Sequence, residues 1–94
     1  MKVTFQFEAQ LRQVAGVNSF DVELPENVSL LTAIQHVSEE AGEALRERLL
    51  TAEKSVQPGI MLFVNELPVP SALTDNHRLD SGDVILLLPP ISGG

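Results

Sequence analysis

The 94-residue sequence contains no cysteine. This absence excludes disulfides, thiolate zinc sites, iron–sulfur clusters, a cysteine nucleophile and persulfide chemistry on the chain itself. Basic residues are scarce, because 6 Lys and Arg stand against 13 Asp and Glu and give a formal net charge of -7. An acidic domain repels phosphate backbones and anionic lipid, so we expect neither nucleic acid nor a membrane surface as a partner.

Long apolar runs are also missing. No segment approaches the roughly 20 residues of a membrane span. Residues 1–6 alternate apolar with polar side chains instead of forming a signal-peptide core, which favours a cytoplasmic location. A chain of 94 residues with 44% hydrophobic composition has room for one small core and therefore for one domain.

Four segments are predicted to be strands. Apolar and polar residues alternate across residues 3–9 and 20–24, which is typical of half-buried strands. Turn-forming residues 16–19 lie between them, so the two strands are expected to pair as an antiparallel hairpin with a long connection. Two continuous apolar runs, residues 60–64 and 84–88, predict two further strands.

A helix is predicted between the two pairs of strands. Ser29 is a candidate N-cap, and apolar residues recur after it at helical spacing as far as Ala41. Gly42 is expected to end this helix, residues 43–50 to form a second helical stretch, and residues 51–59 to form a loop. The order of elements predicts an α+β roll, in which one small mixed sheet packs on one main helix.

Two short segments carry turn signals. Residues 65–70 contain two prolines, which cannot donate to a central ladder, and are expected to form a turn. Residues 80–83 hold Gly82 between two aspartates, a pattern that favours a turn over a catalytic carboxylate pair. A minor strand or 3₁₀ turn is expected near residues 73–79.

Enzyme motifs are absent from the sequence, which has no Gly-rich phosphate loop and no Gly-x-Ser-x-Gly elbow. His36 and His77 lie far apart and are interpreted as surface residues, not as metal ligands or catalysts. The four glutamates between residues 39 and 47 are interpreted as a solvated helix face. We expect no metal site.

Residues 84–88 are apolar at every position, and residues 60–64 repeat this pattern more weakly. A strand with one wet face should alternate, so either the domain covers both faces or the outer face meets a partner. A domain this small can hardly cover both faces with one or two helices, and this favours a protein partner.

The chain ends on Pro89-Pro90 followed by Ile91-Ser92-Gly93-Gly94. The prolines favour an extended exit from the last strand. Chain ends are often small and mobile, but two glycines can also thread a channel too narrow for any other residue. The terminal carboxylate can attack the α-phosphate of ATP to give a mixed anhydride. A partner enzyme would have to supply the ATP and magnesium, because the chain has no nucleotide-binding loop.

Three stretches resemble the ubiquitin-like sulfur carriers of the β-grasp fold, and specifically the family of molybdopterin synthase small subunits. Residues 3–12 followed by Gly16 are similar to the family's first strand and its Phe-x-Ala-x-Leu/Val-Arg segment. Val64-Asn65 before a proline-containing turn resembles the central strand. Residues 79–84 and 88–94 are close to the C-terminal signature.

The resemblance implies a β-grasp domain over residues 1–90 and a flexible Gly-Gly tail over residues 91–94. It implies that an E1-like enzyme adenylates the terminal glycine and that a sulfur donor protein supplies the sulfur of a thiocarboxylate. The tail then enters the large subunit of molybdopterin synthase, where the sulfur builds the dithiolene of molybdopterin. The chain would be the sulfur-donating subunit of that enzyme, not catalytic alone, and would hold no cofactor stably.

Carried over residue by residue, the resemblance makes Gly94 the reactive position, where adenylate and thiocarboxylate form. The threading tail would comprise Gly93, Ser92 and Ile91, with its direction set by Pro89-Pro90.

The resemblance also implies a partner-facing surface. Leu88 and, by strand parity, Leu86 would face the partner. Glu8 departs from the family, whose members often have an apolar and commonly aromatic residue there. The alternation places Glu8 away from the core, so its charge changes this contact surface.

Other functions stay open. The chain could carry sulfur for the thiamine thiazole, a thiolated tRNA base or an amino acid. It could be a ubiquitin-like modifier that ends in an isopeptide bond, or a plain binding module with an incidental tail. The length and the Pro-Pro-x-Ser-Gly-Gly ending favour the molybdopterin branch. Deletion of Gly94 distinguishes carriers and modifiers from a plain binding module. A carrier or modifier should keep its fold and lose its function, whereas a plain module should keep both.

Overall fold

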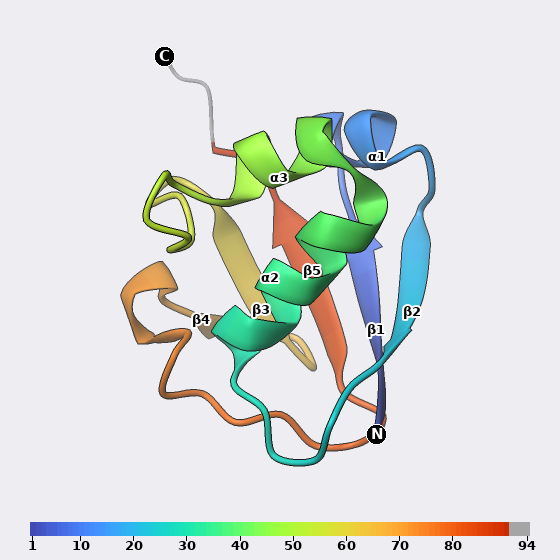
Figure 1. Cartoon of the computed structure of the whole chain (residues 1–94), viewed down its shortest axis with the longest axis vertical. Coiled ribbons are helices and arrows are strands. Elements are labelled where there is room, and N and C mark those ends of the chain that lie inside the picture. The colour runs from blue at the N-terminus through green and yellow to red at the C-terminus, as the bar shows by residue number, and fades with distance from the viewer. Residues whose placement is uncertain (91–94) are drawn as a thin grey trace.

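The computed structural model describes residues 1–90. In chain order its elements are β1 Lys2–Phe7, α1 Gln10–Ala15, β2 Ser19–Glu23, α2 Leu30–Ala41, α3 Glu43–Leu49, β3 Met61–Val64, β4 Leu67–Val69, the 3₁₀ helix η1 Ser71–Leu73, and β5 Val84–Leu88. The strands form one sheet with the order β2-β1-β5-β3-β4, and α2 and α3 lie across one face of it (Figure 1). Within residues 1–90 no helix is long and apolar enough to span a bilayer.

The sheet is mixed. The first and last strands, β1 and β5, run parallel, with Phe5 opposite Ile85 and Phe7 opposite Leu87. The pairs β1–β2, β3–β5 and β3–β4 are antiparallel. A small mixed sheet packed on one main helix is the α+β roll that the sequence predicts. The antiparallel pairing of the first two strands is also confirmed.

The core lies between the sheet and α2. Leu30, Ile34 and Val37 form the apolar stripe of α2, and all three are fully buried. Complete burial of one such side chain stabilises the fold by about 1.5–3 kcal/mol. Ser29 caps α2 by accepting a hydrogen bond from the Thr32 N–H at 3.1 Å, and Gly42 ends the helix with a φ of 109°. Both predicted helix limits are therefore confirmed.

The first predicted strand is too long at its C-terminal end. It stops at Phe7, because Ala9 has a φ of 54°, which turns the chain out of the sheet. The connection to β2 then forms α1, a helix that was not predicted from the sequence. Leu11 is the buried residue of α1 and anchors it to the core.

Residues 65–70 do not form a turn throughout. The turn is confined to Asn65 and Glu66, whose φ values of 50° and 72° suit the type I′ turn of a tight hairpin. Leu67–Val69 then form β4 at the edge of the sheet, where the missing N–H of Pro68 leaves the central ladder intact. The 3₁₀ turn expected near residues 73–79 occurs slightly earlier, as η1.

Candidate functional site

The side chains of strand β5 alternate between two environments, one on each face of the sheet. Ile85 and Leu87 are fully buried on the helix-covered face of the sheet, whereas Val84, Leu86 and Leu88 are only half-buried on the opposite face. No described helix covers this second face (Figure 1). We call it the open face and define it by Thr4, Gln6, Met61, Phe63, Val84, Leu86 and Leu88.

Strand register aligns the open-face side chains in rows. Leu86 lies opposite both Gln6 of β1 and Phe63 of β3, and Leu88 lies opposite Met61. Side chains at facing positions of neighbouring strands project to the same side of the sheet and can touch. Met61 is 38% exposed, although it is large and apolar. The rows therefore make a mainly apolar surface that the described chain leaves partly exposed.

A shallow hollow of about 380 Å³ lies on the open face. It is lined by Gln6, Phe63, Asn65, Glu66, Val84 and Leu86. The lining combines an apolar floor with amide and carboxylate groups, as in the core and rim of protein interfaces. The hollow therefore suits an apolar side chain of a partner better than a charged small ligand.

Asn65 ties the β3–β4 hairpin to the start of β5. Its Nδ2 donates to Asp83 Oδ1 at 2.9 Å, and its Oδ1 accepts from the Val84 N–H at 2.9 Å. Asp83 also accepts from the Asp80 N–H at 2.8 Å, and it is only 9% exposed. The Asp83 carboxylate is thus held in structural hydrogen bonds, which confirms a turn at residues 80–83 and gives no support to a catalytic pair.

Glu8 lies just beyond β1, at the end of the sheet where β5 also ends. Its N–H donates to the Leu87 carbonyl at 3.1 Å, and its carboxylate lies 3.0 Å from Arg12 Nη2. The side chains of this pair are 44% and 47% exposed. Solvent screening keeps the contribution of such a pair to folding small. The charges are instead available to a molecule that approaches this end of the open face.

The chain leaves the sheet through Pro89, which is half-buried, and Pro90, which is exposed. This exit lies at the end of the sheet where α1 and α3 are also found (Figure 1). The predicted tail residues Ile91, Ser92, Gly93 and Gly94 lie outside the described residues. The described chain therefore places Leu86, Leu88 and the tail exit on one strand.

The histidines show no arrangement typical of a metal site. His36 Nε2 lies 2.7 Å from Glu40 Oε1, one turn along α2. The His77 carbonyl accepts from the Leu30 N–H at 2.7 Å. Among residues 1–90, no group of three or more His, Asp and Glu is close enough to hold a metal ion.

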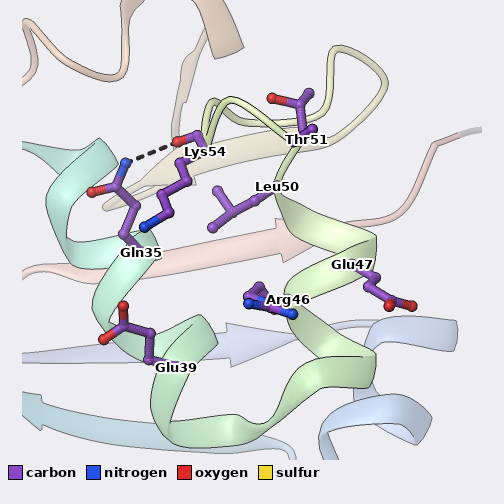
Figure 2. Close-up of a pocket in the computed structure, with 8 residues that line it drawn as sticks. Gln35, Glu39, Arg46, Glu47, Leu50, Thr51 and Lys54 are labelled. Atoms are coloured by element: carbon purple, nitrogen blue, oxygen red, sulfur yellow. Dashed lines mark hydrogen bonds between the residues drawn. The ribbon is translucent and has the colours of Figure 1, made fainter.

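A second hollow, of about 370 Å³, lies on the helix-covered side between α2, α3 and the loop after α3 (Figure 2). Gln35 Nε2 donates to the Lys54 carbonyl at 2.8 Å and joins α2 to this loop. Glu39 and Glu47 share the hollow with two cations, Arg46 and Lys54. The glutamates are exposed, as predicted, whereas no sequence pattern indicated the neighbouring cations. Because the charges balance, this hollow favours no charged ligand, and the open face remains the stronger candidate.

Met61, Phe63 and Gln6 are open-face residues that the sequence analysis did not single out. The apolar run of residues 60–64 includes Met61 and Phe63, so the sequence did indicate an apolar strand at these two positions. Gln6 could be recognised only from the parallel pairing of β1 with β5, which is a contact between distant parts of the sequence.

The topology defines a β-grasp, ubiquitin-like domain. The crystal structure of SAMP1 from Haloferax volcanii superimposes with a TM-score of 0.86 at 22% identity and covers 100% of each chain. A putative molybdopterin converting factor, subunit 1, from Pyrococcus furiosus superimposes with a TM-score of 0.74 at 26% identity, over 97% of this chain and 99% of that one. These likenesses confirm the predicted fold class.

The model of the ThiS family matches residues 5–94, and the chain therefore belongs to this family of ubiquitin-like sulfur carriers. A further relative is Ubiquitin-related modifier 1 of Ajellomyces capsulatus (strain NAm1 / WU24), which is 26% identical over 70 residues. That match covers 74% of this chain and 58% of the relative, so it spans little more than half of that protein's length. The predicted sulfur-carrier family is thereby confirmed.

Proposed function

We propose that this chain carries sulfur as a thiocarboxylate on Gly94 and donates it to build the dithiolene of molybdopterin. The observation that carries the proposal is the combination, on one strand, of an uncovered apolar face and an exit that leads through Pro89-Pro90 to Gly93-Gly94. A chain without cysteine cannot hold sulfur as a persulfide, so the terminal carboxyl group is the reasonable carrier position.

The proposed chemistry at Gly94 has two steps. First, a carboxylate oxygen attacks the α-phosphorus of ATP, so that an acyl-adenylate forms and pyrophosphate leaves. Hydrosulfide then attacks the acyl carbon and displaces AMP, which leaves a C-terminal thiocarboxylate. An E1-like adenylating enzyme would supply ATP and magnesium, and a sulfur donor protein would deliver the hydrosulfide. The chain itself contributes an unhindered carboxylate.

The open face is the proposed docking surface for the activating enzyme and for the large subunit of the synthase. Leu86 and Leu88 lie next to the tail exit, so a partner bound there would receive the tail at a fixed distance. Apolar residues at the centre of an interface supply much of its affinity once water is excluded. Glu8 and Arg12 would lie at the rim of this docking surface. Charges at a rim influence the choice of partner and the association rate more than the affinity.

The proposed branch is molybdopterin synthesis. The Pro-Pro-Ile-Ser-Gly-Gly ending supports this branch, and so does the similarity to a solved protein that is itself described as a putative molybdopterin converting factor subunit. A second candidate is a protein modifier, which the resemblance to SAMP1 and Ubiquitin-related modifier 1 favours. The activation of Gly94 would be shared, and only the acceptor differs.

Intact-mass analysis tests the carrier chemistry. The chain is incubated with an E1-like activating enzyme, ATP and a sulfide source, and is then alkylated. Exchange of oxygen for sulfur changes the mass by almost as much as oxidation of Met1 or Met61, so the alkylation step is essential. An alkylated product that maps to Gly94 is expected, because the chain has no cysteine to compete. Failure to form either adenylate or alkylated product would refute the proposal.

The acceptor is identified in a second reaction with the thiocarboxylated chain. Transfer of sulfur to a cyclic pterin precursor by a molybdopterin synthase large subunit is expected. An isopeptide bond to a target lysine, without sulfur transfer, would instead establish the modifier function. The Gly94→Ala variant is the matched control and should neither transfer sulfur nor form conjugates. It should melt as the unchanged chain does, because the last few residues of a chain usually add little to the stability of a fold.

A further inference from the structure

The loop between α3 and β3 makes a close backbone approach to the chain that leaves β5. At Gly59, an added Cβ would lie 2.9 Å from Pro90 Cγ and 3.0 Å from Pro90 Cβ. Ordinary carbon–carbon contacts begin near 3.5 Å. The space that a side chain would take at Gly59 is therefore already occupied by the Pro90 ring.

The backbone conformation does not explain the glycine at this position. Gly16, Gly42 and Gly82 have φ values of 80°, 109° and 89°, in the left-handed region where other residues are strained. The φ of Gly59 lies outside that region. The other three glycines have nothing within 4 Å of an added Cβ. Gly59 is thus distinguished by contact with Pro90 and not by backbone strain.

The loop side of this contact is held in place by hydrogen bonds and burial, whereas Pro90 is exposed. The Gln57 N–H donates to the Leu49 carbonyl at 2.8 Å, and Gln57 Nε2 donates to the Leu50 carbonyl at 3.0 Å. The Ile60 N–H donates back to the Gln57 carbonyl at 3.1 Å, and the Ile60 side chain is buried. The ring of Pro90 has no rotamer that would clear the space. A methyl group on residue 59 would consequently displace Pro90 and leave the loop in place.

We propose that Gly59 is a positioning residue for the C-terminal tail. Its missing side chain leaves space for the Pro90 ring, and this space, called the seat, fixes the direction of the chain at Pro90. The inference rests on the proposed function, because orientation of the tail matters only if a partner must receive it. In this proposal the open face forms the docking contact, and the seat at Gly59 fixes the position of Pro90, from which the tail begins.

The Gly59→Ala variant separates these two roles. Adenylation is measured by ATP–pyrophosphate exchange with an E1-like activating enzyme, at varied concentrations of the chain. The KM should stay unchanged, because the open face is intact. The kcat should fall about tenfold, because small misplacements of a reacting group are costly. In NMR spectra, shift changes should centre on Pro90 and spare β1.

Two further variants serve as controls. Gly82→Ala adds the same methyl group at the opposite end of β5, where it meets no atom within 4 Å but occupies a φ of 89°. It should lower the Tm by roughly 5 °C without changing kcat. The Gly59→Ala variant should keep its Tm within about 2 °C, because Pro90 lies outside the core.

Pro90→Gly removes both ring atoms that an alanine at residue 59 would meet. If the seat acts through Pro90, Gly59→Ala should have no further effect on kcat in the Pro90→Gly background. A full additional loss in the double variant would overturn the proposal, and so would unchanged Pro90 shifts in Gly59→Ala. An unchanged kcat with displaced Pro90 would overturn it equally.

Failure of the proposed function gives a different pattern. In that case the unchanged chain itself supports no pyrophosphate exchange, whereas the NMR comparison still shows whether Gly59 seats Pro90. Normal exchange by the unchanged chain together with normal exchange by Gly59→Ala contradicts only the positioning role.

Discussion

Ile85 and Leu87 on one side of β5, and Leu86 and Leu88 on the other, belong to the same run of apolar residues. The first pair is fully buried beneath the helices, and the second is half-buried on the open face. Side chains of the same apolar kind therefore have different roles on the two faces. Those under α2 hold the fold together, whereas those on the open face are available for a partner. Hydrophobicity alone does not distinguish a core residue from a docking residue, but sheet parity does.

The largest expected effect comes from the covered side of β5. Leu87→Ala should lower the free energy of unfolding by about 2–5 kcal/mol, because it opens a cavity in a close-packed core. Leu86→Ala is the matched control and should cost less than about 1.5 kcal/mol, since its side chain is only half-buried. Urea denaturation measures both. Equal losses of unfolding free energy in the two variants would show that the two faces of β5 are buried alike.

The next effect concerns docking. Leu88→Asp should weaken binding to the proposed E1-like activating enzyme at least tenfold, because it places a charge in the proposed apolar contact. Leu73→Asp is the matched control, since Leu73 is 50% exposed but lies in η1, away from the open face. Isothermal titration gives the affinity, and thermal melting monitors the fold. If Leu88→Asp unfolds the chain, Leu88 is a core residue and the assignment of the faces is inverted.

A smaller effect is expected at the rim of the open face. Glu66 occupies a position with a φ of 72° in the β3–β4 turn, where a residue other than glycine is strained. Glu66→Gly should raise the free energy of unfolding by about 1 kcal/mol, because it relieves this strain. Urea denaturation again provides the measurement. A loss of stability would indicate that the Glu66 side chain makes a contribution larger than the strain.

The smallest effect on stability is expected for the exposed ion pair. Glu8→Gln should change the free energy of unfolding by less than about 0.5 kcal/mol, because solvent screens the pair with Arg12. It should still change the rate of association with the activating enzyme and the salt dependence of that rate. Stopped-flow binding at several ionic strengths tests this. Identical rates at every salt concentration would remove Glu8 from the docking surface.

Local patterns in the sequence predicted much of the fold. Alternation located β1 and β2, Ser29 and Gly42 marked the limits of α2, and the apolar runs located β3 and β5. These features depend on neighbouring residues. The short helix α1 was missed because residues 3–9 alternate through Ala9, and only the φ of 54° at Ala9 ends the strand.

Contacts between distant segments were the harder part. Parity along one strand places Leu86 and Leu88 on the open face, and their contact with a partner stays a prediction. Their apolar neighbour Phe63 depends on the β3–β5 register. The approach of Gly59 to Pro90 has no local signal, because glycine in a loop normally indicates only a turn.

The position of β5 has a consequence for biosynthesis. Residues 84–88 come late in the sequence but occupy the centre of the sheet, between β1 and β3. The rows of the open face exist only after this strand has inserted, since Leu86 and Leu88 belong to it. An unfolded or misfolded chain would therefore lack this surface. If the proposed partners recognise this face, they would select molecules that have completed their folding.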